Sequence, residues 1–319
     1  MIKCNLQINL APNDYPHARL MLSHQIDAFI NQVDEVVLVL DTHQSKGRFG
    51  QNWVENRENI ETLIDGLSKR YDKVRLVEVD YSPSVMTTVA DYFFGKKFIP
   101  KKDHRGGPFY AYFYGLFISG SRFVLHLDSD IFIGGRSEKW IREACELFAT
   151  NDRLFTCSPL PGPPHPEQVL IGQVAEPLTD PYYFRLKGIS TRIFLIDLEF
   201  FKKHKLTLTH PGVRALIKAS IRKHPTYDLP EDILSAYMHS WGLERIDFLG
   251  TGKGLWSLHP PYRNELFYNS LPELIARVNE NNLHPSQDGF YDIVDEVCDW
   301  TDAKEKLKKN RWWKKMFST

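Results

Sequence analysis

The chain has 319 residues, of which 42% are hydrophobic and 13% aromatic, so it can bury a large core and is not disordered as a whole. Its 40 Lys and Arg residues balance its 40 Asp and Glu residues, which removes the electrostatic case for a nucleic-acid partner. No apolar stretch is long enough to cross a bilayer, so we expect a cytoplasmic protein that is at most peripheral to the inner face of a membrane.

The first half of the chain alternates buried strands with amphipathic helices. Strands are predicted at residues 6–10, 36–40, 74–79 and 123–127. A stripe of apolar residues from Leu22 to Val33 predicts a helix with Pro16 in its first turn, and another helix should begin near Gly107. This alternation predicts an α/β fold with a mostly parallel sheet flanked by helices, a layout typical of nucleotide binding.

The fourth predicted strand ends in two carboxylates, Asp128 and Asp130. Side chains two residues apart on a strand share a face, and ligands of open α/β sheets bind beyond the carboxyl ends of the strands. Two oxygen donors held there suit a divalent cation that carries phosphates. The alternative is a pair of aspartates that only cap a turn or a helix.

The second half begins with a predicted helix over residues 140–148 and a strand at 154–157. The proline-rich residues 158–167 should form a surface loop, either a stiff connector or a lid that faces an acceptor. A strand is predicted at 193–196, and a helix from Pro230 to a glycine cap at Gly242. The cysteines lack the paired spacing of a zinc site, so we expect buried, reduced thiols.

The order of these features resembles the GT-A-fold glycosyltransferases, particularly the large inverting group called family 2. The resemblance covers residues 6–259 and rests on four places: the strand end at Asp41, the glycine-to-helix segment after Arg105, the Asp128-Ser-Asp130 signature, and Glu231-Asp232 followed by a helix and Trp241-Gly242. It implies a GT-A-like sheet shared by two halves. Residues 1–135 would form the nucleotide-sugar-binding half, 136–265 the acceptor-binding and catalytic-base half, and 266–319 a C-terminal helical extension.

The resemblance also implies an activity. The enzyme would be a metal-dependent, inverting glycosyltransferase of the hexosyltransferase type, moving a sugar from a nucleotide-sugar, by default a UDP-sugar, to a hydroxyl of a glycan or lipid-linked glycan. Mn²⁺ or Mg²⁺ would stabilise the diphosphate leaving group. Asp130 would contact the metal directly, and Asp128 the ribose or a metal-bound water. His259 would be a third ligand that favours Mn²⁺, unless it is a loop histidine bonded to backbone.

The remaining candidate residues also take their roles from the resemblance. Asp232 would be the general base that an inverting transfer needs, with Glu231 orienting nearby groups, although the helix macrodipole alone favours carboxylates in a first turn. Other residues would bind the nucleotide part of the donor. These are Asp41 at the base or ribose, Arg105 at the base or a phosphate, and Lys253 and Arg263 at the diphosphate.

Two other functions fit part of the pattern. A sugar-phosphate nucleotidyltransferase also places aspartates around Mg²⁺, but it would open with a glycine-rich, basic phosphate loop, which residues 10–16 lack. A non-catalytic nucleotide- or glycan-binding protein could keep the fold without turnover. The retention of Asp128, Asp130 and Asp232 together argues against that reading.

The C-terminal residues 304–317, from Lys304 to Phe317, concentrate lysines beside Trp312 and Trp313. Lysines with interfacial tryptophans are typical of a peripheral membrane contact, which would suit a lipid-linked acceptor. The alternative is a helix whose aromatic residues pack on the domain while its lysines face water.

Overall fold

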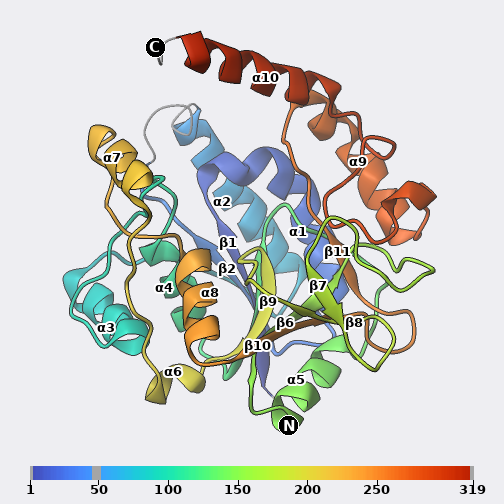
Figure 1. Cartoon of the computed structure of the whole chain (residues 1–319), viewed down its shortest axis with the longest axis horizontal. Coiled ribbons are helices and arrows are strands. Elements are labelled where there is room, and N and C mark those ends of the chain that lie inside the picture. The colour runs from blue at the N-terminus through green and yellow to red at the C-terminus, as the bar shows by residue number, and fades with distance from the viewer. Residues whose placement is uncertain (1–2, 45–51, 317–319) are drawn as a thin grey trace.

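The computed structural model describes residues 3–44 and 52–316, with side chains as far as residue 308. Its helices and strands follow each other as Figure 1 shows. In chain order they are β1 (Cys4–Leu10), a 3-10 turn (Pro12–Asp14), α1 (Tyr15–Phe29), β2 (Glu35–Leu40), α2 (Trp53–Arg70), β3 (Val74–Glu78), α3 (Pro83–Phe94), α4 (Tyr110–Ile118), β4 (Phe123–Asp128), β5 (Phe132–Gly134), α5 (Trp140–Thr150), β6 (Leu154–Pro161), β7 (Ala175–Pro177), β8 (Tyr183–Leu186), β9 (Ile193–Asp197), α6 (Phe200–Lys203), α7 (Val213–Ile221), α8 (Pro230–Ser240), β10 (Glu244–Phe248), β11 (Trp256–Leu258), α9 (Glu265–Asn279), a 3-10 turn (Pro285–Gln287) and α10 (Thr301–Met316).

One sheet runs through the middle of the molecule in the order β3-β2-β1-β4-β9-β6-β10-β8-β7. The strands β3, β2, β1 and β4 are parallel to one another, whereas β9 is antiparallel to both β4 and β6. Beyond β9, β10 is parallel to β6, and β8 and β7 form an antiparallel edge. The prediction of an α/β fold built on a helix-flanked sheet is confirmed, and the sheet is continuous across the predicted boundary at residue 135.

Helices cover both faces of this sheet because successive strand residues point to opposite sides. On β2, Leu38 joins a buried cluster with residues of α1, α2 and α5. Its neighbours Val37 and Val39 join a second buried cluster with residues of α3, α4 and α8. The continuous apolar run of β2 is therefore the signature of a strand that is buried on both faces.

The C-terminal extension belongs to the same folded body. Phe267 of α9 and Trp300 pack in a buried cluster with Phe132 of β5. The ring of His24 on α1 also lies 2.9 Å from the side-chain oxygen of Asn279 on α9. The four cysteines are free and buried, as predicted. No helix in residues 3–44 and 52–316 has the length and apolar character needed to span a membrane.

The proline-rich segment corrects one prediction. Residues 158–161 are not surface loop but the buried end of strand β6. The strand tolerates Pro159 and Pro161 because the hydrogen bonds to the neighbouring segment come from the residues that follow each proline. The N–H of Leu160 donates to the Leu255 carbonyl at 3.1 Å, and the N–H of Gly162 donates to the Ser257 carbonyl at 2.9 Å. Only every second N–H of a strand points to a given neighbour, so proline at the alternate positions costs this pairing nothing.

Candidate functional site

The carboxylates Asp128 and Asp130 lie at the carboxyl end of β4, as predicted. Asp128 is the last residue of the strand, and its Oδ1 lies 3.4 Å from Nε2 of the buried His126. Asp130 is 7% exposed. Burial raises the pKa of the Asp130 carboxyl, Arg263 opposes that rise, and the nearby charge of Asp128 adds to it. The two acidic groups therefore act on each other at one edge of the sheet.

Arg263 supplies a positive charge to this edge. Its Nη1 lies 3.5 Å from Oδ2 of Asp130 and 3.9 Å from Oδ1 of Asp14, which lies in the turn after β1. Burial raises the pKa of Asp14 to about 6, against the opposing charge of Arg263. The strands β1 and β4 are neighbours, so the chain brings Asp14 and Asp130 together around one guanidinium.

His259 is engaged elsewhere. Its Nδ1 lies 2.7 Å from Oδ1 of Asp292, and its backbone N–H donates to Tyr291 at 2.9 Å. The hydrogen bond from His259 lowers the pKa of the Asp292 carboxyl. His259 is close enough to the strand end for its charge to affect the pKa of Asp130, but it does not join the carboxylates as a ligand set.

The predicted metal triad is therefore not preassembled. Within residues 3–44 and 52–316, no three His, Cys, Asp or Glu side chains come together as a metal site. Mg²⁺ is commonly held by only one or two carboxylates together with substrate phosphates, and the donor chemistry of Asp128 and Asp130 fits such a site. A site of that kind would be completed by a diphosphate rather than by His259.

Asp41 and Arg105, predicted at the nucleotide, lie in different surroundings. Asp41 directly follows the parallel strand β2, and its side chain is mostly buried, with the Tyr81 hydroxyl 3.0 Å from its Oδ1 and Lys102 Nζ 3.9 Å from its Oδ2. The Arg105 side chain is exposed, in a turn held by the carboxylate of Asp103. Asp41 thus shares the carboxyl-end edge of the sheet with β4, while Arg105 lies at the exposed surface.

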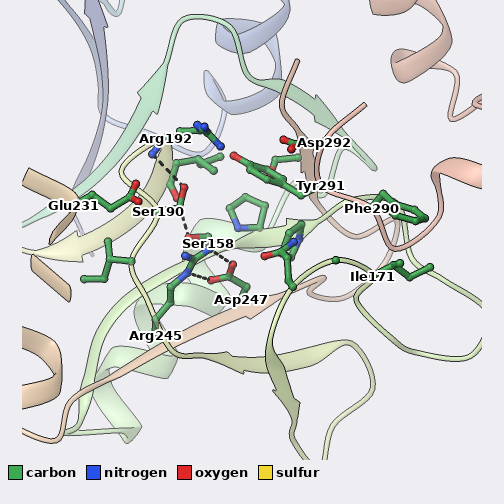
Figure 2. Close-up of a pocket in the computed structure, with 17 residues that line it drawn as sticks. Ser158, Ile171, Ser190, Arg192, Glu231, Arg245, Asp247, Phe290, Tyr291 and Asp292 are labelled. Carbon is green, nitrogen blue, oxygen red and sulfur yellow. Dashed lines mark hydrogen bonds and ion pairs between the residues drawn. The ribbon is translucent and has the colours of Figure 1, made fainter. Parts of the chain in front are cut away.

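A cavity of about 310 Å³ opens beside the carboxylates, on the mixed half of the sheet. Figure 2 shows side chains from distant parts of the chain converging on it, including the ends of β6 and β10 and the segment 290–292. Its volume lies at the lower end of the range of about 300 to 1,000 Å³ that is common for small-molecule sites. Cavity and carboxylates are electrostatically connected, because Arg192 in the cavity wall lowers the pKa of Asp130.

A buried ion pair forms one wall of the cavity. Arg245 is 6% exposed and Asp247 is fully buried. Nε of Arg245 donates to Oδ1 of Asp247 at 2.8 Å, a second contact joins Nη2 to Oδ2, and Nη1 donates to the Gly188 carbonyl at 2.9 Å. Figure 2 shows the pair below Ser158. Because the two charges neutralise each other, this wall is polar without favouring a charged ligand.

Several polar atoms in the cavity wall have no hydrogen-bond partner within the part of the chain that the structure describes. They are the side-chain nitrogen of Gln173, the hydroxyl of Ser257 and the hydroxyl of Tyr291. Buried polar groups are normally hydrogen-bonded, so unpaired ones in a cavity wall indicate a place for a polar ligand or water. The Tyr291 ring also stacks on His259, with centroids 5.9 Å apart.

The two carboxylates at the start of α8 differ in position. Glu231 lines the cavity, and its Oε2 accepts hydrogen bonds at 3.3 Å from the backbone N–H and the hydroxyl of Thr191. Both residues are exposed, but Asp232, predicted as the base, does not line this cavity. Lys253 is likewise exposed, in a turn that packs on Gly135, and it does not line the cavity.

Sequence reasoning missed several residues of this site. Arg245 and Asp247 lie on a strand whose pairing partners could not be read from periodicity, whereas Arg192 belongs to the segment 188–192, which resembles the acceptor-side loop of the family. Tyr291 and Asp292 reach the cavity from the C-terminal extension, more than 150 residues after Asp128 in the printed sequence. For Asp14 a signal was present, because it is an acidic residue in the turn directly after the first buried strand.

No protein family model matches the chain, and no curated protein matches it. Solved structures with a partial likeness include two enzymes in complex with a nucleotide or a nucleotide-sugar. UDP-glucose pyrophosphorylase complexed with UDP-glucose has a TM-score of 0.39 and 10% identity, covering 78% of this chain and 90% of its own. CMP:2-keto-3-deoxy-manno-octonic acid synthetase complexed with CTP has a TM-score of 0.39 and 10% identity, covering 86% and 99%.

Galactosyltransferase LgtC in complex with donor and acceptor sugar analogs has a TM-score of 0.32 and 10% identity, covering 74% of this chain and 70% of its own. The likenesses thus include a glycosyltransferase and enzymes of nucleotide-sugar synthesis. At these scores and identities they carry no argument about activity. A function for this chain has to be argued from its own site.

Proposed function

We propose that the protein is a glycosyltransferase that takes a sugar from a nucleotide-sugar, by default a UDP-sugar, and transfers it to a hydroxyl group of a saccharide held in the cavity. One observation carries the proposal. A pair of interacting carboxylates at the end of an inner strand adjoins a polar cavity whose wall includes a further carboxylate, Glu231.

The donor would bind at the strand end. Mn²⁺ or Mg²⁺ held by Asp128 and Asp130 would stabilise the charge that develops on the diphosphate as the sugar leaves. Arg263 already lies against Asp130 and would add a second positive charge beside the diphosphate. Asp41, which follows strand β2 on the far side of β1 from β4, would accept hydrogen bonds from the ribose or the base.

The acceptor would bind in the cavity. The unpaired groups of Gln173, Ser257 and Tyr291 offer hydrogen bonds to hydroxyl groups, while the paired Arg245 and Asp247 add no net charge. An uncharged, hydroxyl-rich ligand such as a sugar unit satisfies these groups best, since each buried polar group left unpaired costs free energy. A glycan or lipid-linked glycan would present such a unit.

Glu231 would act as general base, because it lines the cavity in which the acceptor hydroxyl would lie. It would take the proton of that hydroxyl as the oxygen attacks the anomeric carbon. Thr191, which donates two hydrogen bonds to the same carboxylate oxygen, would hold Glu231 in place. Asp232 stays the competing candidate that the resemblance suggests. Inversion at the anomeric carbon stays a prediction from the same source.

A thermal-shift panel tests the proposal. UDP-sugars, GDP-sugars, UTP and CTP would each be added with and without Mn²⁺, and a ligand at about 100 times its Kd stabilises the folded state by about 2.7 kcal/mol. A UDP-sugar should raise Tm in the presence of Mn²⁺. The variant Asp130→Asn should lose this shift, whereas Asp180→Asn, which changes an exposed carboxylate elsewhere, should keep it. If no nucleotide-sugar raised Tm, the proposal would be wrong.

The same panel distinguishes the proposed glycosyltransferase from the alternative, a sugar-phosphate nucleotidyltransferase. That enzyme would bind a nucleoside triphosphate at the turn after β1, where this chain places the carboxylate of Asp14 instead of a basic group. The glycine-rich, basic phosphate loop that this reaction would need is missing from residues 10–16, which argues against the reaction. A Tm shift with UTP or CTP, and none with a nucleotide-sugar, would favour it.

A further inference from the structure

Helix α7 carries apolar side chains that project into solvent. Val213, Ile217 and Ile221 are 72%, 56% and 76% exposed. They recur every four residues, so they form one stripe along the helix. On its other side α7 buries Ala219. An exposed stripe of three large aliphatic residues on one short helix is unusual for a surface that faces only water.

A row of basic residues runs beside this stripe. Arg214, Lys218 and Arg222 each follow an exposed apolar residue by one position, so they lie on the adjacent strip of the helix surface. The whole segment 200–227 contains no Asp or Glu, although acidic and basic residues are balanced over the chain. Helix α7 therefore pairs an apolar stripe with charge of a single sign.

The helix is held on the body by a closed neck. The hydroxyl of Thr209 donates to Asp228 at 2.7 Å, and the Asp228 backbone N–H donates back to Thr209 at 3.0 Å. The backbone N–H of His104 donates to Tyr227 at 2.9 Å, which ties the neck to the turn that carries Arg105. These contacts join the two ends of the segment 209–228 and tie it to the body of the protein.

Helix α7 lies toward the edge of the sheet at which the parallel strands have their carboxyl ends. In Figure 1, α7 stands at the upper left, away from the N-terminus and toward the side at which β1 and its parallel neighbours end. Helix α8, which carries Glu231, begins two residues after the neck closes. A surface bound by α7 would therefore lie on the side of the molecule where the strand-end carboxylates are found.

We propose that α7 docks the protein on an anionic lipid surface, with Val213, Ile217 and Ile221 inserted among the headgroups and Arg214, Lys218 and Arg222 paired with lipid phosphates. Basic residues beside an apolar stripe are the known composition of helices that lie in a membrane interface. A protein partner fits this surface less well, because a row of like charges complements any anionic surface and carries no pattern that would recognise a particular protein. The inference stands independently of the proposed transferase chemistry.

Co-sedimentation of the full-length protein with lipid vesicles tests the inference. One set of vesicles contains phosphatidylcholine alone, and the other contains phosphatidylcholine mixed with anionic phosphatidylglycerol. We expect binding to the mixed vesicles only. Each basic residue near an anionic membrane contributes about fivefold in affinity, so Arg214→Gln/Lys218→Gln/Arg222→Gln should weaken binding by about 100-fold. The apolar variant Ile217→Ser/Ile221→Ser should weaken it by at least about tenfold.

Matched variants control for net charge and for exposed apolar area. Lys139→Gln/Arg142→Gln/Lys187→Gln removes the same charge from exposed sites outside α7, and Val174→Ser removes an exposed aliphatic group from the segment before β7. Both should bind as the wild type does. Undiminished binding by both α7 variants, failure of the wild type to bind anionic vesicles, or equal loss in the charge control would each overturn the proposal.

A chain that ends before Lys304 separates α7 from the C-terminal residues. Side chains of 309–316 lie outside the described part of the structure, and Phe317 lies outside it entirely, so the predicted membrane contact of 304–317 stays a prediction. If α7 is the main contact, the shortened chain should keep most of its vesicle binding. Complete loss in the shortened chain, with unchanged binding by the α7 variants, would assign the contact to the C-terminus instead.

Discussion

The two halves of the sheet build their parts of the candidate site in different ways. In the parallel half, Asp41 directly follows β2, Asp128 ends β4 and Asp130 comes two residues later, so each carboxylate is placed by the strand that precedes it. In the mixed half, the cavity takes Arg192, Arg245 and Tyr291 from segments that are far apart in the chain. The comparison teaches that strand ends place single residues locally, whereas a cavity between strands depends on how the whole sheet is paired.

The largest expected effect is on the rate of sugar transfer and comes from a substitution in the cavity wall. Glu231→Gln should lower the rate of sugar transfer by about 10² to 10⁴, the usual contribution of a general base, while donor binding is retained. Asp232→Asn is the matched control on the same helical turn and should change the rate little. Initial rates with saturating donor would separate the two. A large loss in Asp232→Asn with normal turnover in Glu231→Gln would restore Asp232 as the base.

The buried ion pair gives the next largest effect, on stability. Asp247→Asn should lower the free energy of unfolding by about 3 to 5 kcal/mol, because it leaves the buried Arg245 charge without a counterion. Replacing both residues, as Arg245→Met/Asp247→Leu, should recover much of that loss. The exposed pair of Lys69 and Asp65 is the control, and Asp65→Asn should cost less than about 1 kcal/mol. Urea denaturation measures all three, and equal losses would contradict the burial argument.

A substitution of Arg263 tests the charges at the strand end in the parallel half. Arg263→Gln leaves Asp14 and Asp130 facing each other without their shared cation, and it should cost about 1 to 2 kcal/mol, reduced because the side chain is half-exposed. It should also weaken the Tm shift produced by a nucleotide-sugar. A variant with unchanged stability and an unchanged ligand shift would show that the guanidinium contributes nothing at this edge.

The smallest effect concerns Asp14 and depends on pH. Because the folded state raises the pKa of this carboxyl from 3.8 to about 6, its ionisation opposes folding as pH rises through that range. Asp14→Asn should therefore match the wild type at about pH 4 and exceed its unfolding free energy by about 1 to 2 kcal/mol at about pH 8. Denaturation curves at both pH values test this. A variant that is less stable at the higher pH would contradict the sign.

The sequence predicted the strands of the parallel half, and in the mixed half it predicted β9, α8 and part of β6 but not the antiparallel edge of β7 and β8. Strand β2 is an apolar run, β1 alternates apolar with polar residues, and β4 is apolar apart from His126, so their positions and the edge carrying Asp128 could be predicted. Strand β6 was only partly recognised, because Pro159 and Pro161 suggest a loop unless the direction of each N–H is known. The resemblance pointed to Glu231 and Asp232 as a pair, but not to which of them lines the cavity.

The amino-acid pattern alone determined that this chain forms a helix-covered α/β sheet and that acidic side chains gather where an inner strand stops. Those properties are local, since alternation and burial of a strand are written in a few consecutive residues. Tertiary structure decided which charges meet: Arg263 with Asp130, His259 with Asp292, and Arg245 with Asp247. Such meetings depend on strand order and on the return of the C-terminal segment, which no local pattern encodes.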